Sequence, residues 1–306
     1  MDLILKGGCI ITPSCTYVAD VAVKDGKIAA IGKNLSCDEI DRNNPNVEIV
    51  DISGKMLLPG AVDPHTHLDL DLGFCVTADD YFTGTRAAAC GGTTTIIDYP
   101  TQYNEETIVE ACKKRYEIAK DKCCVDYGFH CAITDLGGGA IFDQFSQAIE
   151  AGITSFKCYM VYRDRGMMLN DADLVKVLKA AKDAGVMISV HAENEDLISS
   201  NCKDLVAKGN TSPWYHYVSR PEYVSGEAVS RIIGYTKQVD GQVYIVHTDS
   251  KQGIEAITKA QNEGYHIYAE TCAQYLEFTN DVYKQKDGIN YICSPPIKGE
   301  ESRQSL

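Results

Sequence analysis

Residues 56–69 read Met-Leu-Leu-Pro-Gly-Ala-Val-Asp-Pro-His-Thr-His-Leu-Asp. The apolar run at residues 57–62 predicts a buried strand, and side chains two positions apart along a strand point to the same side. We therefore expect His65 and His67 to leave the carboxyl end of this strand together. Imidazole is a common ligand of divalent zinc, nickel, iron and manganese, so the pair supplies half of a metal site that other segments must complete.

After this stretch the sequence alternates between short apolar runs and helical stretches. The runs predict seven parallel strands, at residues 57–62, 93–99, 125–133, 153–160, 186–192, 243–248 and 266–271. Helices are expected between most of them, at residues 78–90, 105–120, 172–184 and 251–263. Near-continuous apolar strands that alternate with helices indicate a parallel sheet covered by helices, and seven such units without a reversal predict an α/β protein with a (β/α)8 TIM-like barrel. We place this barrel at residues 53–306.

The first 52 residues have a different pattern. Short apolar runs at residues 3–5, 9–11, 21–23 and 28–31 are separated by turn residues at 7–8, 13–14 and 25–26. This pattern predicts a small antiparallel β segment with hairpins, which we interpret as the N-terminal part of a β-sandwich. Residues 34–46 are polar and predict an exposed loop before a further strand at 47–50.

Three more predicted strands carry a candidate metal ligand at or near their carboxyl ends. Lys157, His191 and His247 lie at or near the carboxyl ends of the predicted strands that contain them, and active sites of such barrels lie at these ends. Each residue alone has a structural interpretation, as a hydrogen-bonded histidine or a salt-bridged lysine. Their joint placement with the first pair favours a metal centre.

Other polar residues near these ends have weaker assignments. We interpret the remaining histidines, His130, His216 and His266, as structural or supporting residues. Three carboxylates either orient metal ligands or are structural: Asp98, Glu193 and Glu270.

Composition limits the classes of function. The chain has 306 residues, and 29 basic against 43 acidic side chains give a net charge of −14, which argues against nucleic acid or an anionic membrane as the main partner and favours a small-molecule substrate. No N-terminal signal pattern and no run long enough to cross a bilayer is present, so we expect a cytoplasmic protein. The 13 cysteines form no paired CxxC framework, which predicts reduced thiols.

At this point the sequence resembles the dihydropyrimidinase and hydantoinase branch of the cyclic amidohydrolase superfamily. The motifs that carry the resemblance are ordered and spaced over most of the chain, at residues 58–67, 82–89, 91–95, 155–157, 191–194, 270–272, 274–276 and 293–296. The resemblance implies that His65 and His67 bind one divalent metal ion and that His191 and His247 bind a second. Lys157 would be carbamylated and bridge the two ions, for which zinc is our first choice. An ammonium group cannot bind a cation, whereas the adduct of the neutral amine with carbon dioxide is an anionic oxygen ligand.

The same resemblance implies a reaction. A hydroxide held by the two metals would open the cyclic amide of a dihydropyrimidine or a 5-substituted hydantoin, giving an N-carbamoyl amino acid. Tyr162 matches the tyrosine that hydrogen-bonds the developing oxyanion, although a core aromatic is an alternative interpretation. Ser294 matches the position whose backbone holds the substrate, although Ser-Pro-Pro also suits a rigid strand end. The family further implies a homo-oligomer, a tetramer.

The sequence departs from this branch in several places. The branch carries an aspartate ligand and proton shuttle at the end of an eighth strand, in a segment that would follow Ser294. This chain stops at Leu306, so we expect a barrel that lacks its last strand and a fragment that by itself hydrolyses substrate poorly or not at all. Smaller departures are Thr248-Asp249 and Ala273, and residues 70–75 occupy the loop that gates the substrate's substituent in hydantoinases.

Two alternatives from other classes stay open. Dihydroorotases and allantoinases are the nearest enzymatic alternative, but dihydroorotases place an arginine for a substrate carboxylate where this chain has Asp69. The non-enzymatic alternative is a scaffold like the collapsin-response mediators, which share the fold and lack the metal ligands. Retention of all five candidate ligands argues against the scaffold.

Overall fold

The computed structural model describes residues 2–36, 47–73, 75–103 and 105–306. Its contacts divide the chain into two compact units, one made of residues 1–62 and 88–95 and the other of residues 63–87 and 96–306. The domain boundary that we placed between residues 52 and 53 stays a prediction. No helix among the described residues is both long enough and apolar enough to cross a membrane.

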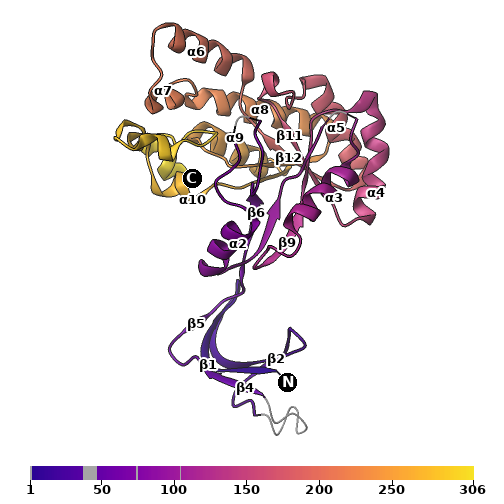
Figure 1. Cartoon of the computed structure of the whole chain (residues 1–306), viewed down its shortest axis with the longest axis vertical. Coiled ribbons are helices and arrows are strands. Elements are labelled where there is room, and N and C mark those ends of the chain that lie inside the picture. Colours follow the sequence, from indigo (N-terminus) through magenta and orange to yellow (C-terminus); the bar gives the residue numbers. More distant parts are fainter. Residues whose placement is uncertain (1, 37–46, 74, 104) are drawn as a thin grey trace. The chain divides into compact units, whose positions relative to one another are not determined.

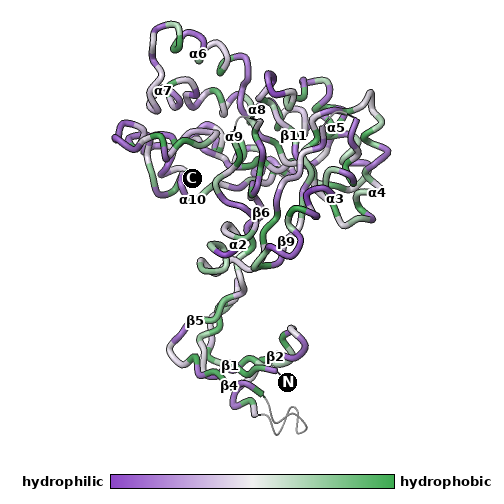
Figure 2. The backbone as a smooth tube through the Cα atoms, in the orientation of Figure 1, coloured by the Kyte–Doolittle hydropathy of each residue, from purple (hydrophilic) through white to green (hydrophobic). Residues whose placement is uncertain are grey.

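The first unit contains a small mixed sheet. Its strands are β1 (Leu3–Ile11), β2 (Thr16–Lys24), β3 (Lys27–Gly32), β4 (Glu48–Asp51) and β5 (Met56–Leu57). The antiparallel pairs β1–β2 and β2–β3 agree with the sequence prediction, but β4 and β5 pair with β1 in parallel. Figure 2 shows largely hydrophobic colour along β1 and β2, where Ile4, Ile10 and Val21 are buried.

The predicted turn at residues 7–8 was wrong. β1 runs through both glycines, and its register against β2 shifts between Leu5 and Gly8. Gly7 has a φ of +72°, which glycine adopts without the steric cost that a side chain would bring, so the two glycines form a bulge within one strand. Of the predicted loop at 34–46, residues 37–46 lie outside the described residues.

Strands and helices then alternate along the rest of the chain. The strands are β6 (Ala61–Thr66), β7 (Thr93–Asp98), β8 (Thr101–Gln102), β9 (Asp126–Phe129), β10 (Cys131–Ile133), β11 (Ser155–Tyr159), β12 (Met187–His191), β13 (Gln242–Ile245) and β14 (His266–Ala269). The helices are α2 (Tyr81–Cys90), α3 (Ile108–Ala119), α4 (Phe145–Glu150), α5 (Asp171–Ala184), α6 (Glu195–Ala207), α7 (Pro213–Val218), α8 (Glu222–Val239), α9 (Lys251–Asn262), α10 (Ala273–Glu277) and α11 (Glu300–Ser305). Short 3-10 segments lie at η1 (Gly137–Gln144), η2 (Arg163–Arg165), η3 (Asn280–Lys284) and η4 (Gly288–Tyr291).

The parallel strands form two sheets that continue into each other. One has the order β14-β13-β12-β11-β10-β8, with every neighbouring pair parallel, and the other has the order β6-β7-β9. Backbone hydrogen bonds from His130 N to Asp98 O (2.9 Å) and from Ala132 N to Pro100 O (2.8 Å) carry the ladder across the breaks in these strands. The result is the strand and helix order of a (β/α)8 barrel, and within the described residues no strand follows β14. Figure 1 shows α3, α4 and α5 on the outer side of β11 and β12.

The first barrel strand begins later than the sequence predicted. β6 spans Ala61–Thr66 rather than residues 57–62. Pro59 cannot donate a backbone hydrogen bond to a ladder, and a Cβ atom at Gly60 would stand only 2.1 Å from the side-chain oxygen of Thr94. This segment therefore leads into the strand, and the paired register resumes when Ala61 N donates to Gly92 O at 3.0 Å.

Candidate metal centre

The five candidate ligands lie in or just after four barrel strands, four of them at the carboxyl ends and Lys157 in the middle of its strand. His65 is in β6 and His67 follows it, Lys157 is in β11, His191 ends β12, and His247 stands two residues after β13. Asn194 and Ser250 then cap the next helices: their side chains accept hydrogen bonds from Leu197 N (3.1 Å) and Gly253 N (3.2 Å). The cap of a helix thus lies three residues after each of these two histidines. The direction in which the chain leaves His191 and His247 is therefore fixed by nearby residues in the sequence.

The structure brings these five side chains together. Lys157 Nζ lies 2.9 Å from His65 Nε2. The ring centroids of His65 and His67 are 5.2 Å apart, those of His65 and His247 5.3 Å, and those of His191 and His247 4.4 Å. The geometric part of the sequence prediction, that four strand ends converge on one place, therefore matches the fold.

Burial favours the neutral forms of these groups. The Lys157 side chain is 1% exposed, and burial lowers the pKa of its amine to about 7. Burial, together with the nearby charge of Lys157, lowers the pKa of His65 to about 2. Burial also lowers the pKa of His67 and of His247 well below the ordinary value. Neutral imidazoles keep a lone pair for a metal ion, and a neutral amine can react with carbon dioxide.

Two of the three carboxylates named in the sequence analysis bond to histidines of the cluster. Glu270 bonds to His65 Nδ1, and its other contacts are with Tyr244 Oη (3.1 Å) and His247 N (3.2 Å). Glu193 accepts from His191 Nε2 at 2.8 Å. Such bonds fix the imidazole tautomer, so His65 turns Nε2 and His191 turns Nδ1 toward the centre. The third carboxylate, Asp98, contacts no ligand and binds the backbone of Leu68 instead, at 3.1 Å.

The donor set fits two metal ions only if Lys157 takes part. Buried Nδ1 atoms of His67 and His247 have no hydrogen-bond partner. Among the residues that the structure describes, however, no three His, Cys, Asp or Glu side chains form a metal-binding group. Each pair of histidines supplies two ligands, so a third must come from elsewhere, and the buried amine next to His65 is placed to supply an oxygen ligand once it carries a carbamate.

Tyr162 and Ser294 lie beside this cluster. The Tyr162 ring stands edge-on to His191, with centroids 5.1 Å apart, and its backbone N–H donates to Glu195 Oε2 at 2.8 Å. Burial raises the pKa of Tyr162 to about 12 and the charge of Glu193 adds to the shift, while a side-chain hydrogen bond with Ser294 opposes it. Tyr162 also has a φ of +71°, an uncommon conformation for a bulky residue and a frequent one at functional sites.

A cavity of about 460 Å³ opens next to His67. Its walls come from the loop after β6, the end of β8, and the segment after β11. The lining includes Tyr103, Tyr159, Met167 and residues 70–73 of the loop that the sequence had singled out. The cavity therefore lies beside the candidate metal centre.

Sequence reasoning missed a second layer of buried charges. Lys298 forms a buried ion pair with Asp249 (3.1 Å) and donates to Arg220 O (2.5 Å), and the Arg220 side chain lies 3.6 Å from Glu193. Only Asp249 carried a signal, as a departure from the family pattern. Of the remaining histidines, His130 and His216 bond to the carbonyls of Pro64 (3.0 Å) and Cys293 (2.7 Å), and His266 is exposed.

The fold and the site together define a class: a parallel α/β barrel protein with a cluster of histidines and one lysine at its strand ends. The profile of the amidohydrolase family matches residues 56–224, and the chain belongs to that family. It is 38% identical to a D-hydantoinase of Geobacillus stearothermophilus and 36% identical to one of Rhizobium radiobacter, in each case over 100% of this chain and over 64% and 65% of the relative.

Solved structures agree with these relatives. The crystal structure of a D-hydantoinase matches with a TM-score of 0.95 at 38% identity, over 100% of this chain and 65% of that chain. A dihydropyrimidinase from Brevibacillus agri matches with a TM-score of 0.93 at 37% identity, over 99% and 64%. The predicted family and the predicted barrel are thereby confirmed, and the chain spans about 64% of the length of the curated relatives that it matches.

Proposed function

We propose that this chain carries the catalytic centre of a metal-dependent hydrolase that opens the cyclic amide of dihydropyrimidines or 5-substituted hydantoins and yields N-carbamoyl amino acids. Divalent metal use is general in the amidohydrolase family, and the relatives are D-hydantoinases. The observation that carries the proposal is the convergence of four histidines on one fully buried lysine amine.

In this proposal His65 and His67 hold one ion, His191 and His247 hold the other, and both ions are zinc. The neutral amine of Lys157 would add to carbon dioxide: the nitrogen–carbon bond forms as one C=O π bond opens to C–O⁻, and the nitrogen loses one proton to solvent. The resulting carbamate would supply anionic oxygen ligands for the ions. The lowered pKa of Lys157 supports this step, because an ammonium group has no lone pair to attack with. When bound, two such ions supply a nucleophilic water at neutral pH and polarise the substrate carbonyl.

The chain's own side chains would then guide the substrate. Tyr162 keeps its proton over the physiological range, because burial raises its pKa to about 12, and it can therefore donate a hydrogen bond to the oxyanion that develops on the ring carbonyl. Ser294, which bonds to Tyr162, would hold the cyclic amide through its backbone groups. The cavity beside His67 would take the substituent at ring position 5.

Two further assignments remain predictions, and two alternative functions are disfavoured. A homotetramer and a cytoplasmic location rest on resemblance and composition. A dihydroorotase or allantoinase-type activity is disfavoured by Asp69, whose carboxylate lies 3.9 Å from Lys122 and offers a substrate carboxylate no cation. A scaffold role is disfavoured because all five candidate ligands are present and converge.

Metal analysis tests the centre directly. We expect the purified chain to bind about two zinc ions, and chelation to lower its melting temperature, because a ligand that binds only the folded state stabilises it by mass action. His191→Gln should reduce the bound zinc, whereas His266→Gln, on the exposed edge of β14, should not. Fewer than one zinc ion per chain under saturating zinc and bicarbonate would contradict the proposal.

The role of Tyr162 is testable by kinetics in a protein that contains the whole chain. Tyr162→Phe removes one hydroxyl and should lower kcat for hydantoin and dihydrouracil hydrolysis by about 10²–10³, the usual cost of losing one oxyanion donor, with little change in KM. Tyr223→Phe, at a side chain that is 48% exposed on α8, is the matched control. Equal kcat values for Tyr162→Phe and the control would remove Tyr162 from the mechanism.

A further inference from the structure

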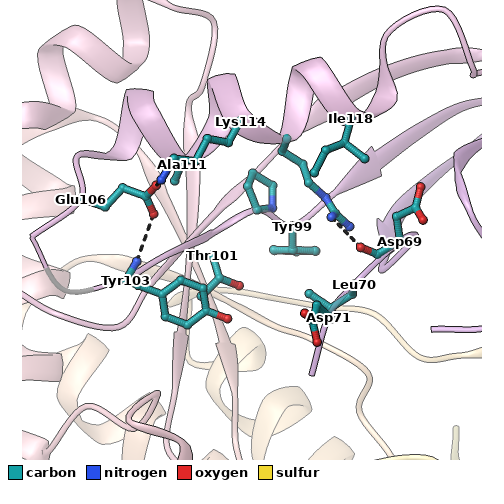
Figure 3. A pocket seen from close by; sticks show the side chains of 12 residues that line it. Asp69, Leu70, Asp71, Tyr99, Thr101, Tyr103, Glu106, Ala111, Lys114 and Ile118 are labelled. Carbon is teal, nitrogen blue, oxygen red and sulfur yellow. Dashed lines mark hydrogen bonds and ion pairs between the residues drawn. The ribbon is translucent and has the colours of Figure 1, made fainter. Parts of the chain in front are cut away.

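A buried arginine donates hydrogen bonds to the backbone directly after the His65–His67 pair. Arg115, on α3, is 8% exposed, and its guanidinium donates to two successive carbonyls: Nη1 to Asp69 O at 2.9 Å, and Nη2 to Leu68 O. The bond to Asp69 is the dashed line that ends at this residue in Figure 3. The fork geometry of a guanidinium allows one side chain to hold both carbonyls at once.

Asp98, on the neighbouring strand, binds the same backbone segment. It ends β7, is fully buried, and accepts a hydrogen bond from Leu68 N at 3.1 Å. Arg115 Nη2 lies 3.6 Å from Asp98 Oδ2, and the guanidinium lies over the Tyr81 ring at 5.1 Å. The N–H of Leu68 is thus bound by the anion of this pair and its carbonyl by the cation.

The backbone segment that Arg115 and Asp98 bind has an uncommon conformation. Asp69 has a φ of +48°, in the left-handed region that side chains disfavour. Residues in this region persist where surrounding contacts determine them. Asp69 O accepts from Arg115, Asp69 N donates to Asp79 O at 2.9 Å, and the Asp69 carboxylate accepts from Tyr81 N at 3.4 Å, so the Arg115 bond is one of three that hold this residue. The turn at Asp69 begins two residues after His67, so the direction in which the chain leaves the ligand pair depends on it.

A buried ion pair is a poor way to add stability, since an apolar pair of the same volume often does as well. What an apolar pair cannot do is hold a backbone N–H and two carbonyls in one orientation. The Arg115–Asp98 pair carries no net charge as a whole. It can therefore fix the backbone next to the proposed metal site without adding net charge there.

We propose that Arg115 and Asp98 are positioning residues that orient the His65–His67 pair for its metal ion by fixing the backbone at Leu68 and Asp69. This inference rests on the proposed metal centre. It assigns a function in ligand orientation to a helix residue that contacts no ligand side chain. Groups that orient first ligands typically change metal affinity by about 10–100-fold when they are removed.

Two measurements test the proposal in three variants of the full chain. Arg115→Met keeps the length and apolar stem of the side chain, and Arg115→Lys keeps the charge but loses the fork. The control, Arg231→Met, removes an arginine of α8 that is ion-paired with Asp171 of α5 (2.6 Å) and with Glu227 of α8 (2.8 Å). Zinc affinity is measured by competition with a chromophoric chelator. Hydrogen exchange at residues 65–69 is measured in metal-free protein.

We expect Arg115→Met to lower the affinity for one of the two zinc ions about 10–100-fold and to raise the rate of amide hydrogen exchange at residues 65–69. Arg115→Lys should recover part of both, and Arg231→Met should match the wild type. A purely structural role would change the melting temperature of the metal-free protein while leaving zinc affinity and local exchange untouched, and that result would overturn the proposal.

The two proposals fail in different ways. A wild-type chain that binds no zinc would contradict the proposed function, while exchange at residues 65–69 still decides whether Arg115 holds this backbone. A wild-type chain that binds two zinc ions, together with an Arg115→Met variant of equal affinity and equal exchange, would contradict only the positioning role. If Arg115→Met does not fold, Arg115→Lys gives the same decision, because it lacks the fork.

Discussion

Replacing Lys157 by methionine is expected to abolish binding of the metal pair while leaving the metal-free fold at least as stable as the wild type. The Lys157 amine is buried, with one hydrogen bond to His65 and with the rings of Tyr99 and Tyr159 at 4.4 and 5.2 Å. Burying a polar group with few partners costs about 1–3 kcal/mol, and methionine fills a similar volume without that cost. Zinc content should therefore fall from about two ions toward none, and hydrolysis by a longer protein that contains the whole chain should fall by more than about 10³-fold.

The same variant has a distinct pH signature in metal-free protein. The pKa of Lys157 is lowered from 10.5 to about 7 by burial, so between these values the unfolded chain binds one more proton than the folded chain. Stability of the wild type should therefore rise with pH from about 7 to about 10.5, by up to about 1.4 kcal/mol per pH unit from this group. Lys157→Met should lack this component of the slope. Urea unfolding at several pH values measures the difference between the two proteins.

Lys176→Met is the matched control for this experiment. Lys176 is 62% exposed and paired with Asp173 on α5, so its loss should change neither zinc content nor the pH slope. Lysine 157 would be excluded as a metal ligand by a Lys157→Met protein that still holds two zinc ions. If the free energy of unfolding had the same pH dependence in Lys157→Met and in the wild type, burial would not hold the Lys157 amine in its neutral form.

The largest effect on folding stability is expected from Phe156→Ala, one residue before the candidate ligand. Phe156 is fully buried in β11 and stacks on Phe145 of α4, with centroids 4.7 Å apart and planes 21° apart. Truncation removes the ring from between sheet and helix and leaves a cavity, which costs about 3–5 kcal/mol for phenylalanine. Urea unfolding of the metal-free protein measures this loss.

The control for this prediction is Phe82→Ala, since Phe82 is 48% exposed on α2. We expect its effect to stay within about 0.5–1 kcal/mol. A loss below about 1 kcal/mol for Phe156→Ala would mean that the core around β11 collapses into the space, contrary to the packing described here.

Much of the fold follows from local patterns that the sequence carries openly. Apolar runs of strand length alternate with amphipathic stretches, and the structure has strands and helices in that order, with α5 and α9 within one residue of their predicted bounds. The barrel then follows from a general rule about parallel strands. The convergence of His191, His247 and Lys157 was predictable for the same reason, because parallel strands end at one edge.

Local patterns were misleading where one residue's geometry depends on a distant partner. The first barrel strand was placed four residues too early, since an apolar run does not reveal that Gly60 packs against Thr94. The glycines at 7–8 were read as a turn, since only the pairing with β2 shows that they bulge within one strand.

The sequence by itself therefore determined the family, the barrel and the set of residues that meet at its strand ends. Only the tertiary structure decided how those residues are held: by Glu270 behind His65, by Glu193 behind His191, and by the Arg115–Asp98 pair behind His67. The physical reason is range. Backbone periodicity is set by neighbours in the chain, whereas a buried hydrogen bond or ion pair joins residues tens to hundreds of positions apart, and its partner is known only once the chain has folded.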